Sequence, residues 1–286
     1  MLTFTNYRIS TMTATGCIGV NVNLDSLYDH VIIVDILDTN VMGIVYAEFG
    51  SNKHSQICKG VNLKKRYVRV NGKKEAYTKR FDNSVTIKYR VNEKDTLNIK
   101  VFKNGKIQMT GVKSVEQGKN AIQSIIDMIK NIHENHDKEV VDNIDDLKFT
   151  RFDIHLINSD FRVDMEIRRD LLYNLLLKEF SVSSSYEACI YPGVKIQYNL
   201  NKNLDINTTP LGKQGKCCCP TPCNGKGDGI TTDACKKITI SIFQSGCILI
   251  TGVTKEIHID IAYNFIKNVL NENHDKIKRV KLQLPS

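Results

Sequence analysis

The sequence contains no hydrophobic run long enough to cross a membrane. Even the apolar run Val31-Ile-Ile-Val34 is ended by Asp35, whereas a membrane-spanning helix needs about 20 apolar residues. The N-terminus is polar and lacks the layout of a secretory signal peptide. We therefore expect a protein that stays inside the cell.

An even cysteine framework is also missing. Four of the nine cysteines crowd into Cys217–Cys223, a spacing that favours reduced thiols or a metal over a set of disulfides. Cys17, Cys58 and Cys189 have no His or Asp partner that the sequence places beside them, so nucleophilic catalysis has no support.

Clusters of histidines or acids that would form a catalytic or metal site are absent as well. His133 and His136 have no further ligands near them, and the acidic linker Lys138–Asp146 is most simply a solvated connection. We therefore do not expect an enzyme. The net charge of +9 and the pI near 9.0 favour a polyanionic partner, although many basic proteins bind no nucleic acid.

One eleven-residue pattern occurs twice, over Phe102–Val112 and Phe243–Val253. Phe, Gly, Ile, Thr, Gly and Val recur in register, and each copy leads into a helical stretch that reaches the same pentapeptide, Glu134–Lys138 or Glu272–Lys276. Repeated supersecondary units predict a pseudo-symmetric fold. The chain is therefore a tandem of one unit.

The strands of the two copies alternate in the same way. The apolar face carries Ile99, Val101, Ile107 and Met109 in the first copy and Ile238, Ile240, Ile242, Ile248 and Ile250 in the second. The opposite face carries Lys100, Phe102, Gln108 and Thr110, then Thr239, Ser241, Phe243, Leu249 and Thr251. A phenylalanine that lies twice on the face away from the core calls for an explanation. The strand before the first hairpin places Thr86, Lys88 and Arg90 on its polar face.

Two insertions interrupt the repeat. The first, at about residues 50–80, is strongly basic, and we interpret it as a solvated loop, with a nucleic-acid-binding arm as the alternative. The second, at about residues 201–237, is rich in Gly, Pro and Lys and favours a flexible loop without a cofactor. The alternative is a zinc site formed by Cys219, Cys223, Cys235 and one neighbour, although no Cys-x-x-Cys pair is present.

The repeated motif, together with Lys79-Arg-Phe81, Ser185-Tyr-Glu187 and Tyr191-Pro-Gly193, resembles the TATA-box-binding protein family. The insertions and the Asn- and Lys-rich composition look like the divergent TATA-binding-like proteins of large DNA viruses. The resemblance implies an α+β fold in which a first repeat (residues 1–140) and a second (residues 147–286) form one saddle. Its curved antiparallel sheet would carry the helices on the convex side.

The resemblance also implies a function. The chain would be a transcription initiation factor that sits on the minor groove of A/T-rich promoter DNA and bends it, in the nucleus, in a cytoplasmic viral factory or packaged in virions. The implied wedges are Phe81, Phe102, Tyr191 and Phe243; the implied groove contacts are Gln108, Thr110, Leu249 and Thr251; and the implied phosphate contacts are Arg80, Lys88, Arg90 and Lys106. Glu187 and the convex surface would bind a transcription factor IIB-like protein or polymerase subunits.

Several residues depart from the family pattern. Tyr replaces Phe at position 191, Cys247 stands where the family has a lysine, and no asparagine aligns with the family's base-reading positions. Four extra residues separate Phe81 from Phe102, so Phe81 is alternatively an ordinary core residue. The alternative function is a protein-interaction scaffold on the same fold, with an enzyme that uses the fold to grip a substrate as a more distant possibility.

Overall fold

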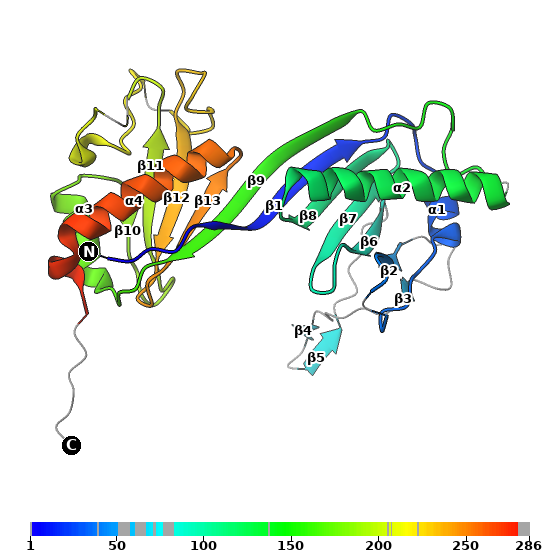
Figure 1. The fold of residues 1–286 in the computed structure, drawn as a ribbon, viewed down its shortest axis with the longest axis horizontal. Coiled ribbons are helices and arrows are strands. Elements are labelled where there is room, and N and C mark those ends of the chain that lie inside the picture. The colour runs from blue at the N-terminus through cyan, green and yellow to red at the C-terminus, as the bar shows by residue number, and fades with distance from the viewer. Residues whose placement is uncertain are drawn as a thin grey trace. The chain divides into compact units, whose positions relative to one another are not determined.

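The computed structural model describes residues 2–38, 40–50, 58–60, 67–70, 73–76, 83–136, 138–204, 206, 208–221 and 223–279, with 67–70 and 73–76 as backbone only. The chain forms two compact units (Figure 1), an N-terminal unit of Met12–His155 and a C-terminal unit of Met1–Thr11 with Leu156–Ser286. Strands β1 (Arg8–Cys17) and β9 (Arg151–Arg162) contribute residues to both units. The compact units therefore do not end where the predicted repeats do, and the division into repeats at 1–140 and 147–286 stays a prediction.

The N-terminal unit is an antiparallel sheet with a long helix. Its further elements are α1 (Leu24–His30), β2 (Gly43–Glu48), β3 (Cys58–Gly60), β4 (Tyr67–Val70), β5 (Lys73–Ala76), β6 (Ser84–Arg90), β7 (Thr96–Phe102), β8 (Lys106–Val112) and α2 (Val115–His136). The strand order is β1-β8-β7-β6-β2-β3, and β4 and β5 pair separately. Of the basic insertion, the structure describes only β3, β4 and β5.

The C-terminal unit has the same plan. Its elements are β9, α3 (Arg169–Lys178), β10 (Ser184–Ser185), β11 (Val194–Leu200), the 3-10 turn η1 (Leu211–Lys213), β12 (Lys236–Ile242), β13 (Cys247–Val253) and α4 (Glu256–Ile277). The strands follow the order β9-β13-β12-β11-β10. The predicted α+β class with an antiparallel sheet is confirmed in both units, and each hairpin and each long helix lies where the repeat predicts it.

The core of each unit lies between one sheet face and its long helix. The predicted apolar positions of β7, β8, β12 and β13 are all fully buried, and α2 packs on β8 while α4 packs on β12 and β13. Ser114 caps the start of α2, where its Oγ accepts a hydrogen bond from the Gln117 amide at 3.1 Å. The N-cap residue of α4 is Lys255, whose side chain makes no capping hydrogen bond.

Helix α1 is short, and an extended segment follows it. The helix ends at His30, and the Val34 amide donates to the Ile44 carbonyl at 2.8 Å. The residues after His30 therefore run beside β2 instead of continuing the helix. None of the helices in the described part of the chain combines the length and the apolar character needed to span a bilayer.

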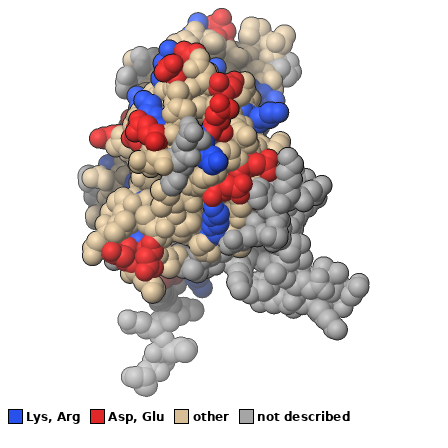
Figure 2. All heavy atoms as spheres, turned by 90° about the vertical axis from the view of Figure 1, so that its right-hand side faces the viewer, with Lys and Arg blue, Asp and Glu red and all other residues tan. Residues whose placement is uncertain are grey.

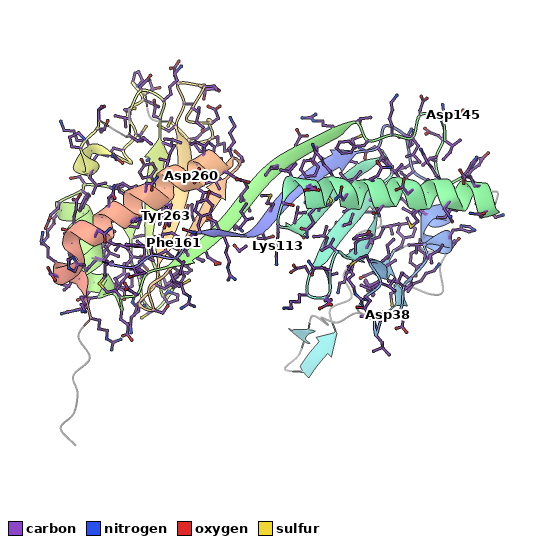
Figure 3. The ribbon with its side chains drawn as sticks, in the orientation of Figure 1. Asp38, Lys113, Asp145, Phe161, Asp260 and Tyr263 are labelled. Carbon is purple, nitrogen blue, oxygen red and sulfur yellow. The ribbon has the colours of Figure 1, made fainter. Side chains whose placement is uncertain are left out.

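A small aromatic cluster shows which face of the C-terminal unit is covered by α4. The ring of Tyr263, on α4, lies 5.7 Å from that of Tyr7 and 4.7 Å from that of Phe161 (Figure 3). The Tyr7 hydroxyl donates to Asp260 at 2.7 Å, and burial together with this carboxylate raises the pKa of Tyr7 to about 12. The opposite face of the sheet carries none of the helices described for this unit.

Candidate nucleic-acid interface

The helix-free face of the C-terminal unit is rich in hydroxyl, amide and aliphatic groups. It carries Lys195 and Gln197 from β11, Thr239 and Ser241 from β12, and Leu249 and Thr251 from β13. Thr239 pairs with Thr251 across the β12–β13 ladder, and Ser241 pairs with Leu249. These are the groups that fit a minor groove, whose floor presents acceptors and whose walls are apolar sugars.

Two aromatic side chains meet at one end of this face. The Tyr191 and Phe243 rings lie with their centroids 5.7 Å apart, tilted by 58°. Tyr191 is placed by a turn in which its amide donates to the Glu187 carbonyl at 2.9 Å. Phe243 follows the end of β12, and its amide donates to the Cys247 carbonyl at 2.9 Å. The structure thus brings together the two wedges predicted for the second repeat.

Gly193 makes this approach possible. A Cβ atom there would lie 2.9 Å from the Tyr191 ring, closer than real Cβ contacts, and 3.2 Å from the Phe243 ring, closer than most of them. Any larger residue would push the two rings away from their position. The packing of the two rings therefore explains why glycine occupies position 193 of Tyr191-Pro-Gly193, a segment that also resembles the family.

Cationic side chains surround the ring pair. The Lys195 ammonium lies 4.0 Å from the centroid of the Tyr191 ring, within cation–π range. Arg169, at the start of α3, donates to the Pro192 carbonyl and, at 3.2 Å, to Gln244 Oε1, so it ties the turn after Tyr191 to the turn after Phe243. Arg169, Pro192 and Gln244 line a pocket. Phe243, Ser245 and Glu166 complete its lining. The sequence analysis missed both cations, although the alternation in β11 was a signal for Lys195.

The N-terminal unit presents an equivalent face on β7 and β8. Thr110 is exposed and pairs with Thr13 of β1, and Gln108 pairs with Thr15. Lys106 is exposed near the turn, and Phe102 is half-buried opposite Ser84. Phe81 and Arg80 lie outside the described residues.

The two predicted basic residues of β6 differ in their surroundings. The Lys88 ammonium lies 5.0 Å from the centroid of the Tyr46 ring, and the residue stays partly exposed. Arg90, by contrast, is only 6% exposed. Its guanidinium donates to the carbonyls of Ile36 at 2.6 Å, of Asp35 and Val41 at 3.3 Å each, and of Asp38. The assignment of Arg90 to DNA is therefore corrected: it holds the segment before β2 to the sheet.

Carboxylates on these faces have partners of their own. Asp160 of β9 accepts hydrogen bonds from Arg8 Nε at 2.8 and 2.9 Å, and Glu48 of β2 accepts one from the Tyr46 hydroxyl at 2.7 Å. The view in Figure 2 shows acidic and basic side chains interspersed, so the net positive charge does not form a single basic surface there. The Arg8 guanidinium therefore offsets the repulsion that the Asp160 carboxylate would exert on a DNA phosphate.

Comparison with known proteins decides the family. Residues 55–132 match the family model described as "Transcription factor TFIID (or TATA-binding protein, TBP)". A "TATA-box-binding protein-like" protein of Acanthamoeba polyphaga mimivirus is 31% identical over 285 residues, which cover 97% of this chain and 68% of the viral protein. The chain belongs to the TATA-binding protein family. A solved structure, Methanococcus jannaschii TBP, covers 93% of this chain and 97% of its own at 17% identity and a TM-score of 0.48.

Membership in the TATA-binding protein family confirms the resemblance inferred from the repeated motif, including its likeness to the proteins of large DNA viruses. The chain has the family's fold and is a DNA-binding transcription factor at the level of the family, which is not a family of enzymes. Glu187, the predicted partner-binding residue of this TBP-like chain, is exposed on the turn that carries Tyr191.

Proposed function

We propose that this TBP-like chain is a promoter-binding initiation factor that binds the minor groove of A/T-rich DNA through its helix-free sheet faces. It bends the duplex by inserting aromatic side chains between base steps. Proteins of this kind offset the unstacking cost, a few kcal/mol per step, by the contacts that bent DNA allows. We further propose that the protein acts in the nucleus or in a cytoplasmic viral factory, with packaging in virions as a further possibility.

The observation that carries this proposal is the Tyr191–Phe243 pair. Its rings lie on the face away from α4, beside Lys195 and next to a floor of threonine, serine and leucine side chains. An aromatic pair that only filled the core would lie on the other face, among the isoleucines of β12. Phe102 supplies a wedge of the same kind in the N-terminal unit, for which Phe81 is the proposed companion.

Binding is tested by gel shift on matched A/T-rich and G/C-rich duplexes. We expect tighter binding to the A/T-rich duplex, because the guanine amino group of G·C pairs occupies the floor of the minor groove. Equal and weak binding to both duplexes would support the scaffold alternative, in which the fold retains its partner surface without bending DNA.

The proposed phosphate contacts predict a salt dependence. Replacing Lys106 or Lys195 with alanine should lower the slope of log K against log salt by about 0.9 for each phosphate that the variant no longer neutralises. The control is Lys130→Ala, which removes an exposed lysine from α2. A slope that stays unchanged in both test variants, or falls equally in the control, would count against the proposed phosphate-binding role.

A substitution at Glu187 should weaken partner binding without weakening DNA binding. We propose that its exposed carboxylate binds a transcription factor IIB-like protein or a polymerase subunit, so Glu187→Arg should weaken that complex by about tenfold or more through charge reversal. The affinity for DNA alone should not fall. Glu93→Arg, an equivalent change at an exposed turn of the N-terminal unit, is the control; equal loss in both variants, or in neither, would contradict a role for Glu187. The measurement is titration of the purified partner onto the protein–DNA complex.

A further inference from the structure

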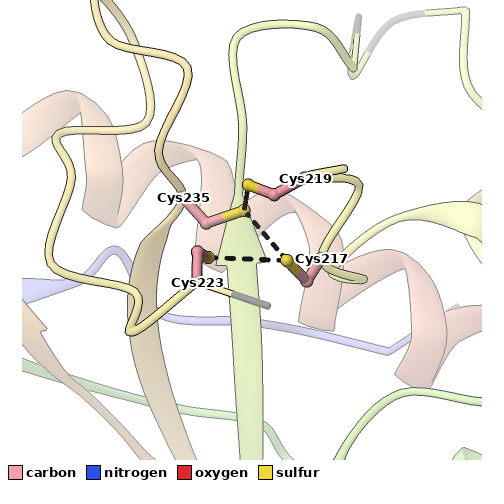
Figure 4. A group of neighbouring side chains, drawn as sticks. All are labelled: Cys217, Cys219, Cys223 and Cys235. Atoms are coloured by element: carbon pink, nitrogen blue, oxygen red, sulfur yellow. Dashed lines mark hydrogen bonds between the residues drawn. The ribbon is translucent and has the colours of Figure 1, made fainter. Parts of the chain in front are cut away.

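The insertion between β11 and β12 gathers four cysteine sulfurs. The Sγ atoms of Cys217, Cys219, Cys223 and Cys235 all lie within 4.8 Å of one another (Figure 4). Cys217 lies 3.5 Å from Cys223 and 3.7 Å from Cys235, which in turn lies 3.5 Å from Cys219. Cys218, between the first two, is not part of the group. The fold therefore brings together three cysteines of the run Cys217–Cys223 with Cys235, and it leaves Cys218 out.

These distances fit a tetrahedral metal site. Four sulfurs bound at about 2.3 Å to a central zinc ion would lie roughly 3.8 Å from one another. Disulfide sulfurs lie at about 2.0 Å, much closer than any of the measured pairs. The cluster thus has the dimensions of a Cys₄ site, and a small inward adjustment of the more distant pairs would complete the tetrahedron.

The surroundings of the sulfurs are also those of a metal–thiolate site. Cys235 is fully buried. The buried Asn201 side chain directs its amide nitrogen to Cys235 Sγ at 3.4 Å and to Cys219 Sγ at 3.6 Å, and is itself held by the Asp233 carbonyl at 2.8 Å. Hydrogen-bond donors that point at the ligand atoms from outside orient and stabilise metal-bound thiolates.

The backbone holds the two distant ligands side by side. The Lys237 amide donates to the Gly225 carbonyl at 2.9 Å, and the Gly227 amide donates to the Cys235 carbonyl at 3.0 Å. Gly225 adopts a φ of +69°, which favours glycine at the turn after Cys223. The described part of the insertion contains few buried apolar side chains. Hydrophobic packing alone therefore contributes little to the stability of this loop, whereas a bound metal would cross-link it.

We propose that Cys217, Cys219, Cys223 and Cys235 bind one Zn²⁺ ion in a structural site that folds the insertion against β11 and β12. Binding replaces the four thiol protons with the metal, and four protein ligands leave no open position for catalysis. Four thiolates and one Zn²⁺ ion leave two negative charges, and Lys216, Lys226 and Lys236 lie within a few residues of the four ligands in the sequence. The site is independent of the DNA-facing residues.

The test is the metal content of the full-length protein purified under reducing conditions with zinc in the medium. We expect one zinc ion per chain by mass spectrometry, and, after replacement with Co²⁺, the d–d and thiolate charge-transfer absorption of a tetrahedral thiolate site. Cys217→Ser should lose the metal and, with it, the fold of the insertion, but because this side chain is exposed, the rest of the C-terminal unit should still fold. Cys235→Ser should also lose the metal.

Cys218→Ser and Cys189→Ser are the matched controls, since both thiols are exposed and lie outside the cluster. Both should retain zinc and the cobalt spectrum. A protein without zinc whose four thiols all react freely would overturn the proposal, and so would one that has formed two disulfides under the same reducing conditions. Loss of zinc in the control variants to the same extent as in Cys217→Ser would also overturn it.

Discussion

Phe243→Ala is expected to abolish most of the DNA bending while the protein stays folded. Base–aromatic contacts contribute about 1–3 kcal/mol each, so the affinity for A/T-rich DNA should fall by about 5- to 150-fold. A buried Phe→Ala change costs about 3–5 kcal/mol of stability, but Phe243 is only half-buried, on the face away from α4, and its loss should cost far less. The measurement pairs thermal unfolding with fluorescence-detected bending. Phe102→Ala should behave in the same way.

The matched control for Phe243→Ala is Tyr263→Ala. Tyr263 is also a half-buried aromatic, but it lies on α4 against Phe161, so its loss should reduce stability and leave bending by the folded protein intact. The double variant with Tyr191→Ala should show strong coupling, because the two rings are in contact. If Phe243→Ala and Phe102→Ala melt much earlier than the wild type yet bend DNA normally when folded, these residues belong to the core and the scaffold interpretation replaces the wedge.

Arg90→Met is expected to destabilise the N-terminal unit by about 3 kcal/mol. A hydrogen bond from a charged donor contributes about 1.5–3 kcal/mol, and Arg90 donates to four carbonyls of residues 35–41. These carbonyls lie in a partly exposed segment, so water would satisfy some of them in the variant and limit the loss. Chemical unfolding measures the change, and the DNA affinity of the remaining folded protein should be unchanged.

Lys88→Met on the same strand provides the opposite control. Lys88 is partly exposed, and its ammonium lies over the Tyr46 ring. Because Lys88 is a proposed phosphate contact, its loss should lower the salt dependence of DNA binding and destabilise the protein less than Arg90→Met does. If Arg90→Met were as stable as the wild type and instead lowered the salt slope, then Arg90 would be a phosphate contact and the correction drawn from its burial would be wrong.

The hairpins and their two faces could be predicted from alternation alone. Isoleucines at every second position place Thr239, Ser241 and Phe243 on the other face, whatever the neighbouring segments do. The repeat supplied the second argument, since Phe102 and Phe243 occupy equivalent places before a tight turn. The contact between Tyr191 and Phe243 depends on a long-range approach, which only the family resemblance could indicate in advance.

Arg90 shows where alternation fails. The pattern puts it on the polar face with Thr86 and Lys88, but the residues from Asp35 to Val41 fold back over the end of β6 and bury it. No local pattern in β6 encodes that contact, because its partners are backbone carbonyls 49 to 55 residues earlier.

The cysteine cluster illustrates a related limit. Three of its four members could be named from the sequence, but the fourth, Cys217, could not be distinguished from Cys218. The spacing Cys-x-Cys-x₃-Cys, with Cys235 much later, is not the usual pair of short knuckles. Asn201, whose amide points at two of the sulfurs, lies at the start of the insertion, 18 residues before Cys219 and 34 before Cys235. The local sequence around the cysteines therefore does not indicate its role.

The measurement that tests the proposed function most directly is the bend angle of DNA in complex with the wild-type protein. Donor and acceptor dyes at the ends of matched A/T-rich and G/C-rich duplexes report it by energy transfer, with Phe243→Ala as the reference for unbent DNA. A large bend in the A/T-rich duplex that is absent with the variant is the predicted result. Tight binding to the A/T-rich duplex with the same end-to-end distance as free DNA would contradict minor-groove wedging by this protein.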